Sequence, residues 1–425
     1  MSPANHARRR RPRSSDAFSM ATSLPMRLLL VVVVVLLAIA YVVVQLVRPV
    51  PAVAASVTPI STTMPGVPVP LSWPAQGEAA IGVEGTGLLG THGAQTPTPL
   101  ASVTKLMTAY LVLRDHPLTV TAPGPNIIIT PADVTTYQQD KAAGDSVVPV
   151  QDGEQLSERQ ALQALLIPSG DNIATLLAQW DAGTEPAFVA KMNAAAKQLG
   201  LTGTHYVDAS GVASGTQSTA ASQVRLAMLD MSMPAFRAIV DMAQVTLPVA
   251  GLQYNVDALL GKDGIVGVKT GYTTTAGGCF VFAADTTIDG KPRILVGAIF
   301  RQFGTTAQPS AITAVFDATT ALVTSADHAF EQSAVVHRGQ ALGHLDAPWT
   351  GSVDLEAARG VTLTGLPGQR VTATVVLPDK VHAPIPAGRD FGTAVVEMGN
   401  ERVRVPLVTS SALPAAPMTW RLTNV

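Results

Sequence analysis

A serine and a lysine one helical turn apart constrain this chain more than any other feature. The run Pro99-Leu100-Ala101-Ser102-Val103-Thr104-Lys105 leads into an apolar pattern that Pro117 closes. This pattern predicts a helix over 102–114. Residues three apart share a face of a helix, so the Ser102 hydroxyl can meet the Lys105 amine. A neighbouring base makes a serine nucleophilic, and burial or nearby positive charge makes lysine such a base.

Two further motifs favour a catalytic interpretation of this pair. Pro168-Ser169-Gly170-Asp171-Asn172 stands where a loop enters a helix, and Gly267-Val268-Lys269-Thr270-Gly271-Tyr272-Thr273 opens a region of strand character. A Lys-Thr-Gly strand beside a nucleophile can hold a carboxylate, with Lys269 as the cation and Thr270 as a hydroxyl donor. Gly271 lets a substrate lie close to the backbone. The order Ser-x-x-Lys, Ser-x-Asx, Lys-Thr-Gly is that of β-lactamases and penicillin-binding proteins.

From about residue 75 onwards the chain resembles the low-molecular-mass penicillin-binding proteins that act as serine D-alanyl-D-alanine carboxypeptidases. The blocks that carry the resemblance are Ala101–Ala109, Phe188–Asn193, Leu199–Thr202, Thr204–Tyr206, Ser218–Ala220 and Gly267–Gly278. The resemblance implies an α+β fold. A penicillin-binding/β-lactamase-like catalytic domain, an antiparallel sheet with a helical cluster, would precede a small C-terminal β-sandwich domain.

The resemblance also implies a role for each motif residue. Ser102 would attack the penultimate D-Ala carbonyl of a peptidoglycan stem pentapeptide with Lys105 as base, and Ser169 would relay the proton to the departing D-alanine. The oxyanion would lie between the N–H groups of Ser102 and Tyr272, and water would resolve the acyl-enzyme. β-Lactam antibiotics would acylate Ser102, and no cofactor or metal is implied. The substrate-binding residues would be Asp171, Lys269, Thr270, Gly271, Tyr272 and Thr273.

Position 171 departs from the family pattern. The family's second motif usually ends in Asn, whose amide donates to a substrate carbonyl; here Asp171 holds that place and Asn172 comes one residue late. An ionised Asp cannot donate that bond. It would pair with a cationic lysine of the site and favour the charged lysine. The alternative is a loop that turns Asn172 into the site. A second departure is Asp208-Ala209-Ser210-Gly211, where the family usually shows Asn-Pro-His-Gly.

The first 48 residues predict a single-pass membrane anchor. Leu28 to Val47 is apolar apart from Gln45, and Arg8, Arg9, Arg10, Arg11 and Arg13 precede it. About 20 apolar residues span a bilayer, and the arginines assign residues 1–26 to the cytoplasm, so the chain beyond the helix at 27–48 is expected outside the cell membrane. The alternative is a secretory signal cleaved near Ala54, although the apolar region of a signal usually runs roughly 7–15 residues.

The remaining chain is expected to form a linker and two domains. Seven prolines over 49–74 predict an extended Pro-rich tether. Short alternating runs between turns over 328–425 predict a β-rich spacer domain. A catalytic domain is expected at 75–327, with a hairpin over 80–89, helices at 157–167, 171–181, 186–199, 220–231, 234–241 and 310–326, and strands at 265–270, 278–286 and 292–300.

Composition limits the classes of function. A net charge of −2 over 425 residues implies no nucleic-acid partner. The single cysteine, Cys279, excludes an intrachain disulfide and is expected to be a small core residue. The eight histidines show no metal-ligand spacing.

Two rival functions remain open. A β-lactamase needs a deacylating carboxylate between the second and third motifs, and Glu185 there lies before a helix that resembles the carboxypeptidases. A degenerate cell-wall-binding homologue would use the cleft without turnover, and Asp171 is the only support for it. Within the enzyme class, the sequence does not separate carboxypeptidase from transpeptidase or endopeptidase.

Overall fold

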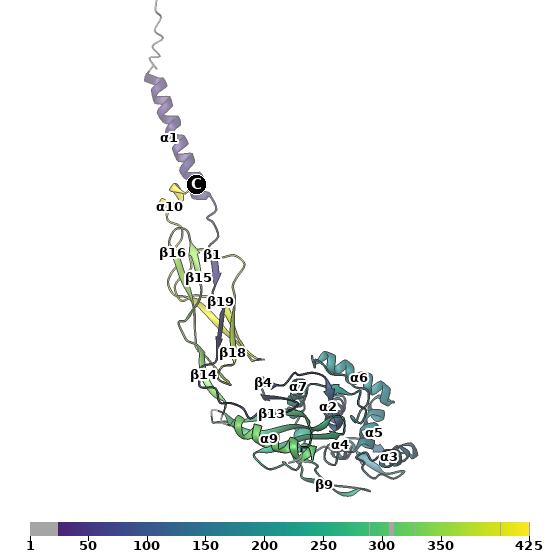
Figure 1. Cartoon of the computed structure of the whole chain (residues 1–425). Coiled ribbons are helices and arrows are strands. Elements are labelled where there is room, and N and C mark those ends of the chain that lie inside the picture. The colour runs from purple at the N-terminus through teal and green to yellow at the C-terminus, as the bar shows by residue number, and fades with distance from the viewer. Residues whose placement is uncertain (1–23, 289, 306–309, 328, 400, 425) are drawn as a thin grey trace, which may run out of the picture.

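The computed structural model describes residues 24–288, 290–305, 310–327, 329–399 and 401–424. Figure 1 shows three parts in succession: the helix α1 (Leu24–Val47), a β-rich part, and a part in which sheet and helices are mixed. The arginines at 8–13, and with them most of the expected cytoplasmic tail, lie outside the described residues.

A five-stranded antiparallel sheet is the base of the mixed part, in the order β11-β12-β13-β3-β4. Early and late segments of the chain meet in it, because β3 pairs with β13. Consecutive residues of β12 from Gly277 to Ala284 are buried, since both faces of the sheet are covered. The strands are β3 (Glu78–Val83), β4 (Gly87–His92), β11 (Ile265–Thr273), β12 (Gly277–Ile288) and β13 (Lys291–Gln302).

One face of this sheet packs on a single helix and the other on a helical cluster. Helix α9 (Ala311–Asp327) covers the face that carries Phe280 and Phe282. Helix α7 (Ala220–Met231) packs on the opposite face, beside Val281 and Ala298. The other helices of the mixed part are α2 (Lys105–Asp115), α3 (Pro131–Ala143), α4 (Glu158–Leu166), α5 (Asp171–Ala182), α6 (Glu185–Gln198) and α8 (Pro234–Val240).

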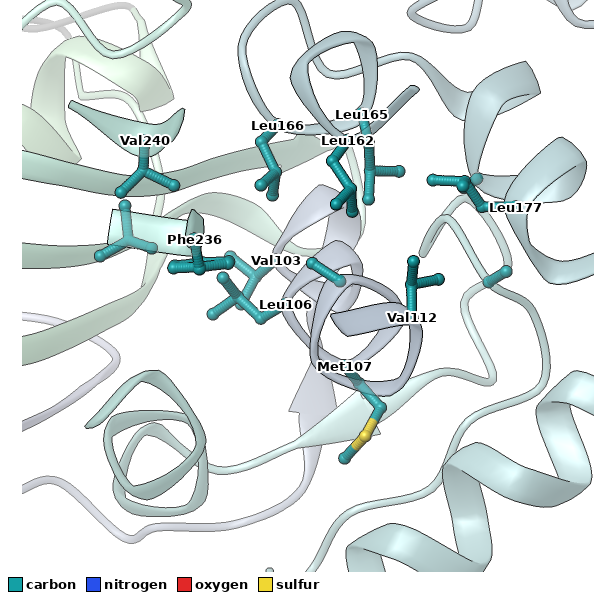
Figure 2. Packing of buried hydrophobic residues seen from close by; sticks show 14 of the residues in the cluster. Val103, Leu106, Met107, Val112, Leu162, Leu165, Leu166, Leu177, Phe236 and Val240 are labelled. Atoms are coloured by element: carbon teal, nitrogen blue, oxygen red, sulfur yellow. The ribbon is translucent and has the colours of Figure 1, made fainter. Parts of the chain in front are cut away.

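Helix α2 lies at the centre of this cluster. Figure 2 shows its side chains Leu106, Met107 and Val112 among residues of α4, α5 and α8, and these three are completely buried. Truncating such a side chain to alanine costs about 2–5 kcal/mol. The burial therefore holds the start of α2, where the serine and lysine motif stands, in one position.

The helices and sheet strands of the mixed part begin and end within about three residues of the predicted bounds, apart from α3, where no helix was predicted. Helix α3 was not predicted because only Tyr137 of it is buried, so it lacks an apolar face. A capping box between Thr130 and Asp133, with Pro131 in the first turn, stabilises its start. Three two-stranded ribbons complete this part: β5 (Thr98–Pro99) with β8 (Gln217–Ser218), β6 (Asn126–Ile128) with β7 (Gln155–Ser157), and β9 (Gln244–Leu247) with β10 (Gly251–Tyr254).

The β-rich part has its own buried core, which contains Leu345, Leu355, Val396 and Leu407. A seven-stranded antiparallel sheet and a two-stranded ribbon, β14 with β17, enclose it. The sheet order is β1-β15-β16-β20-β19-β18-β2. The strands are β1 (Ala54–Val57), β2 (Ile60–Thr63), β14 (Glu331–Val336), β15 (Ala341–Ala347), β16 (Gly351–Ala357), β17 (Val361–Gly365), β18 (Arg370–Val376), β19 (Asp390–Met398) and β20 (Glu401–Thr409).

The expected Pro-rich linker over 49–74 differs from the structure. Two of its segments are the outermost strands of this sheet: β1 pairs with β15, and β2 pairs with β18. They cover both edges, whose backbone groups would otherwise lack partners, and Val53 and Met64 beside them enter the core. The pattern missed them because each is only four residues long and lies between prolines. The mixed part is thus inserted between two segments of the β-rich part.

Deleting residues 52–66 should therefore destabilise the β-rich part and leave the mixed part intact. Losing the burial of Val53 and Met64 alone costs about 1.5–3 kcal/mol each, which lowers the melting temperature of a domain of about 100 residues by roughly 10 °C or more. Calorimetry of a chain of residues 67–425 should show this against 52–425 as the control. Identical melting of the two chains would contradict the strand assignment.

Candidate active site

The Ser-x-x-Lys motif lies on a short 3₁₀ turn, η1 (Ala101–Thr104), that runs into α2. The predicted helix at Ser102 thus begins as a 3₁₀ turn, and its α-helical part starts at Lys105. Ala101 has a positive φ of 48°, and the Thr104 hydroxyl donates to its carbonyl at 2.9 Å. Residues i and i+3 eclipse in a 3₁₀ turn, which brings Lys105 Nζ to 2.8 Å from Ser102 Oγ.

Lys105 is completely buried, and its ammonium group meets three oxygen atoms. Nζ lies 2.5 Å from Asp171 Oδ1, 2.8 Å from Ser102 Oγ and 3.3 Å from the Ser210 carbonyl. An ammonium has three N–H donors, and each has an acceptor here. Asp171 and Ser210 can only accept, so the position facing Ser102 is the one that a lone pair can take in the neutral amine.

Asp171 holds the place at which the second motif usually has an asparagine amide. Besides Lys105, its carboxylate accepts from the Ser146 backbone N–H at 2.9 Å through Oδ2, and its own N–H donates to the Ser146 carbonyl. It is the first residue of α5, where the helix dipole favours negative charge. Both carboxylate oxygens are thus engaged with donors, and the side chain is only 7% exposed.

Asn172 does not point into the site. Its side-chain amide donates to the Val148 carbonyl and accepts from the Val148 N–H, both at 2.9 Å. Of the two alternatives for this loop, the structure therefore has Asp171, not Asn172, beside Lys105. Asn172 instead fastens the start of α5 to the segment around Val148.

Ser169 is buried and has a φ of 71°. A left-handed conformation is uncommon for serine and costs free energy. The N–H of the next residue, Gly170, donates to the Ala164 carbonyl at the end of α4. The sharp turn between α4 and α5 therefore places Ser169 in the wall of the cavity that Ser102 also lines.

The loop Asp208-Ala209-Ser210-Gly211, which departs from the family run, packs against Ala101 and Lys105, on either side of Ser102. The Asp208 carboxylate accepts from the Ser210 hydroxyl and from the N–H groups of Gly211 and Ala213. This holds the Ser210 carbonyl at Lys105. A side chain at Gly211, whose φ is 88°, would overlap the Ala101 carbonyl, since a Cβ there would lie 1.9 Å from that oxygen.

The third motif lies on β11 beside η1. Lys269 is 1% exposed, and burial, helped by the positive charge of Lys105, lowers its pKa to about 7. Its amine donates to the Thr270 carbonyl at 3.0 Å. Burial also raises the pKa of the neighbouring Asp257 to about 6. Lys269 therefore changes its charge near neutral pH.

Gly271 lines the cavity, and its expected role of letting a substrate lie close to the backbone stays a prediction. A Cβ there would lie 2.9 Å from the Leu100 carbonyl and 3.1 Å from the Ser102 backbone nitrogen, so the missing side chain also lets β11 approach the backbone of Ser102. Tyr272 is 53% exposed. The Thr273 hydroxyl accepts from the Ala276 N–H and stabilises the turn to β12.

These elements surround one cavity of about 280 Å³. Its lining comes from all three motifs, from three loops and from the start of α9, and Lys105 and Lys269 lie just behind it. The lining residues are Ser102, Gly144, Asp145, Ser146, Ser169, Asp171, Gly211, Val212, Val256, Thr270, Gly271, Tyr272, Thr273 and Ile312.

Sequence reasoning missed the groups that act through their backbone. Ser146 orients Asp171 through its N–H, and Ser210 meets Lys105 through its carbonyl. The departure at 208–211 marked the second loop, but no pattern marked the first. Glu185, considered for a β-lactamase, accepts from the Ala209 N–H and does not line the cavity. Cys279 is buried in β12, and burial raises the pKa of its thiol to about 12.

Comparison with known proteins identifies the family of this chain. The sequence profile of peptidase family S11, described as D-alanyl-D-alanine carboxypeptidase, matches residues 75–298. The chain belongs to the D-alanyl-D-alanine carboxypeptidase family. The predicted family, the α+β fold class and the class of serine-type peptidase are thereby confirmed.

Different relatives are named for different activities, carboxypeptidase or endopeptidase. A D-alanyl-D-alanine carboxypeptidase of Streptomyces sp. (strain K15) is 32% identical over 218 residues, 47% of this chain and 73% of the relative. A D-alanyl-D-alanine endopeptidase of Pseudomonas aeruginosa is 31% identical over 230 residues, 52% of this chain and 70% of the relative. Among solved structures, penicillin-binding protein 5 of Haemophilus influenzae shares the fold, with a TM-score of 0.58 and 19% identity over 82% of this chain and 100% of that one.

Replacing Asp171 by Asn should raise the rate at which D-Ala-D-Ala peptides are hydrolysed. The carboxylate forms an ion pair at 2.5 Å with the ammonium form of Lys105, which is no base; an amide removes that ion pair and restores a donor towards the substrate. The measurement is the rate of acylation of Ser102 at pH 7.

Asp145→Asn is the matched control, because Asp145 lines the same cavity but makes no ion pair with Lys105 in the described residues. Asn172→Ala should lower thermal stability, because it removes both hydrogen bonds to Val148. An Asp171→Asn enzyme with the wild-type rate of acylation would rule out the charge effect.

Proposed function

We propose that this member of the D-alanyl-D-alanine carboxypeptidase family removes the terminal D-alanine from the stem pentapeptides of peptidoglycan. The observation that carries the proposal is the meeting of Ser102, Lys105 and Ser169 with the Lys-Thr-Gly strand around one cavity of about 280 Å³. A cavity of this size suits the end of a peptide.

Substrate binding begins with the terminal carboxylate. The hydroxyl of Thr270 lines the cavity and donates to the carboxylate, and Lys269 attracts it from just behind the wall. Burial gives this attraction more strength than it has in water. The carboxylate in turn favours the charged form of Lys269, so substrate and lysine stabilise each other's charge.

Acylation follows from the arrangement around Lys105. The neutral amine takes the proton of Ser102 through the position that faces Oγ, while Asp171 and Ser210 hold its two remaining N–H groups. Ser102 Oγ attacks the penultimate D-Ala carbonyl carbon. The proton then passes through Ser169 to the nitrogen of the leaving D-alanine, whose bond to the carbonyl breaks.

The negative oxygen of the tetrahedral intermediate lies between the backbone N–H groups of Ser102 and Tyr272. Gly271 allows this pocket, because a side chain there would crowd the Ser102 nitrogen. Each such donor contributes about 10²–10³ in rate. A water molecule then attacks the ester while Lys105 takes its proton. The bond between Ser102 Oγ and the carbonyl carbon breaks, Lys105 returns the proton to Oγ, and the shortened peptide leaves. β-Lactams enter the first half of this path by presenting a carbonyl and a carboxylate at similar places.

The chain would act outside the cytoplasmic membrane, held by α1 as a retained anchor. Met26–Val47 forms a helix with a mean hydropathy of 3.1, only 6% buried in the protein. A membrane supplies the apolar surroundings that such a surface needs. Cleavage near Ala54 would cut at the first residue of β1, which favours the uncleaved form. Recovery of a soluble chain beginning at Ala55 from cells would refute the anchor.

Incubation of residues 52–425 with a stem pentapeptide tests the function. We expect equimolar release of D-alanine and the tetrapeptide, and slow acylation by penicillin. Rapid penicillin hydrolysis without D-alanine release would indicate a β-lactamase, and binding without turnover a degenerate homologue. A crosslinked dimer offered in the same assay separates endopeptidase action, and an added acceptor amine reports transpeptidation.

Ser102→Ala should abolish D-alanine release, because no other described nucleophile lines the cavity beside a base. Ser214→Ala, an exposed serine of a nearby loop, is the control and should keep full activity. Residual release above about 1% of wild type in Ser102→Ala, with the fold intact by circular dichroism, would exclude Ser102 as the nucleophile.

The value of kcat/KM for a peptide with a free terminal carboxylate should fall above pH 7, because Lys269 loses its charge there. The fall should approach tenfold per pH unit, since kcat/KM reports the free enzyme. The same peptide with a terminal carboxamide should be a poor substrate without this decline. A parallel decline for both peptides would show that Lys269 does not recognise the carboxylate.

A further inference from the structure

A second cavity, of about 220 Å³, lies far from the active site, where the chain leaves α1. Its walls come from both ends of the chain. It is lined by Gln45, Arg48, Pro49, Val50, Pro51, Trp420, Arg421 and Asn424. Figure 1 shows the helix α10 (Met418–Thr423) beside the end of α1, at the far end of the β-rich part from the mixed part.

Direct contacts fix α10 against α1. The Tyr41 hydroxyl donates to the Leu422 carbonyl at 3.2 Å, and Arg421 Nη1 donates to the Leu46 carbonyl at 2.7 Å. The ring of Trp420 packs edge-on against Trp349 at a centroid distance of 5.5 Å. The cavity is therefore held between the last turn of α1 and the β-rich part.

The cavity carries positive charge and one unsatisfied acceptor. Neither Arg48 nor Arg421 forms an ion pair with a carboxylate of the described residues. Arg421 uses one of its five N–H donors for the Leu46 carbonyl, so four donors remain for an occupant of the cavity. Gln45 is 6% exposed, and its Oε1 has no hydrogen-bond partner in the described chain. An occupant should thus offer an anion and a hydrogen-bond donor.

The membrane span places this cavity at a definite depth. The 22 residues Met26–Val47 make a helix about 33 Å long, close to the roughly 30 Å of a bilayer's hydrocarbon core. Residues just beyond Val47 must then lie among the lipid headgroups. Tryptophan is typical of that layer at both surfaces of a membrane, and the guanidinium of an arginine matches the geometry of a phosphate group.

We propose that this cavity binds the headgroup of a phosphatidylglycerol-type lipid. The phosphodiester lies between the guanidinium groups of Arg48 and Arg421, and a glycerol hydroxyl donates to Gln45 Oε1. The bound lipid fastens the β-rich part to the outer surface of the cytoplasmic membrane. It thereby sets the distance from that membrane at which the catalytic cavity meets the cell wall. This inference rests on the retained anchor proposed above.

Native mass spectrometry of the full chain in detergent micelles tests the site. The probes are phosphatidylglycerol and phosphatidylmethanol, which carry the same charge and differ in the headgroup hydroxyls. We expect one retained lipid per chain, with phosphatidylglycerol preferred about fivefold, the effect of one hydrogen bond. Phosphatidylethanolamine, in a third arm, should be retained less than either.

Three variants separate the contributions of charge and hydrogen bond. Arg48→Gln with Arg421→Gln should lose both anionic lipids. Gln45→Leu should keep both and lose the preference between them. Arg338→Gln with Arg370→Gln, which removes two exposed arginines elsewhere on the β-rich part, should behave as the wild type. Calorimetry of each variant reports that its β-rich part is folded.

Flotation of the full chain with membranes is measured alongside. A chain that floats but retains lipids without preference, or equally in all variants, overturns the lipid site and leaves the anchor standing. A chain found wholly in the soluble fraction overturns both the anchor and the site. Neither result bears on the catalytic assignment, which the soluble residues 52–425 test separately.

Discussion

The buried contact between Lys105 and Asp171 is the interaction on which the catalytic site depends. Two charges removed from water are costly unless each finds its partners, and here every partner comes from a different element. The packed helix α2 holds the lysine, the start of α5 and the Ser146 backbone hold the carboxylate, and the loop at Asp208 brings the Ser210 carbonyl. The pair therefore forms only when these elements of the helical cluster pack against one another.

The same contact explains why the third motif must lie so close. Lys269 on β11 is buried beside Lys105, and each positive charge opposes the other. One negative charge, Asp171, lies near both. In the proposed function a substrate carboxylate adds a second, so binding relieves the repulsion between the two lysines. Gly271 makes this closeness possible, since a side chain there would separate the strand from the turn that carries Ser102.

The sequence predicted the parts whose chemistry depends on local spacing. Ser102 and Lys105 meet as their three-residue spacing requires, and the apolar periods of α4, α5 and α7 gave bounds within one or two residues of those observed. The strand that carries Lys269 was predicted from its Lys-Thr-Gly motif and from the continuous apolar run after it, which forms β12.

Features that depend on distant partners were not predictable. Helix α3 lacks an apolar face, and β1 and β2 acquire their structure from strands that come about 290 to 310 residues later in the chain. The choice between Asp171 and Asn172 is decided by the Val148 backbone, which occupies the amide of Asn172 on both sides. No pattern within the motif contains that information.

Mass spectrometry of residues 52–425 after brief exposure to penicillin tests the catalytic couple most directly. We expect one adduct per chain, carried by the peptide that contains Ser102, and formation at least about a hundredfold slower in Lys105→Ala because its base is lost. An adduct on another residue, or formation at the wild-type rate without Lys105, would contradict the assignment of Ser102 as nucleophile and Lys105 as its base.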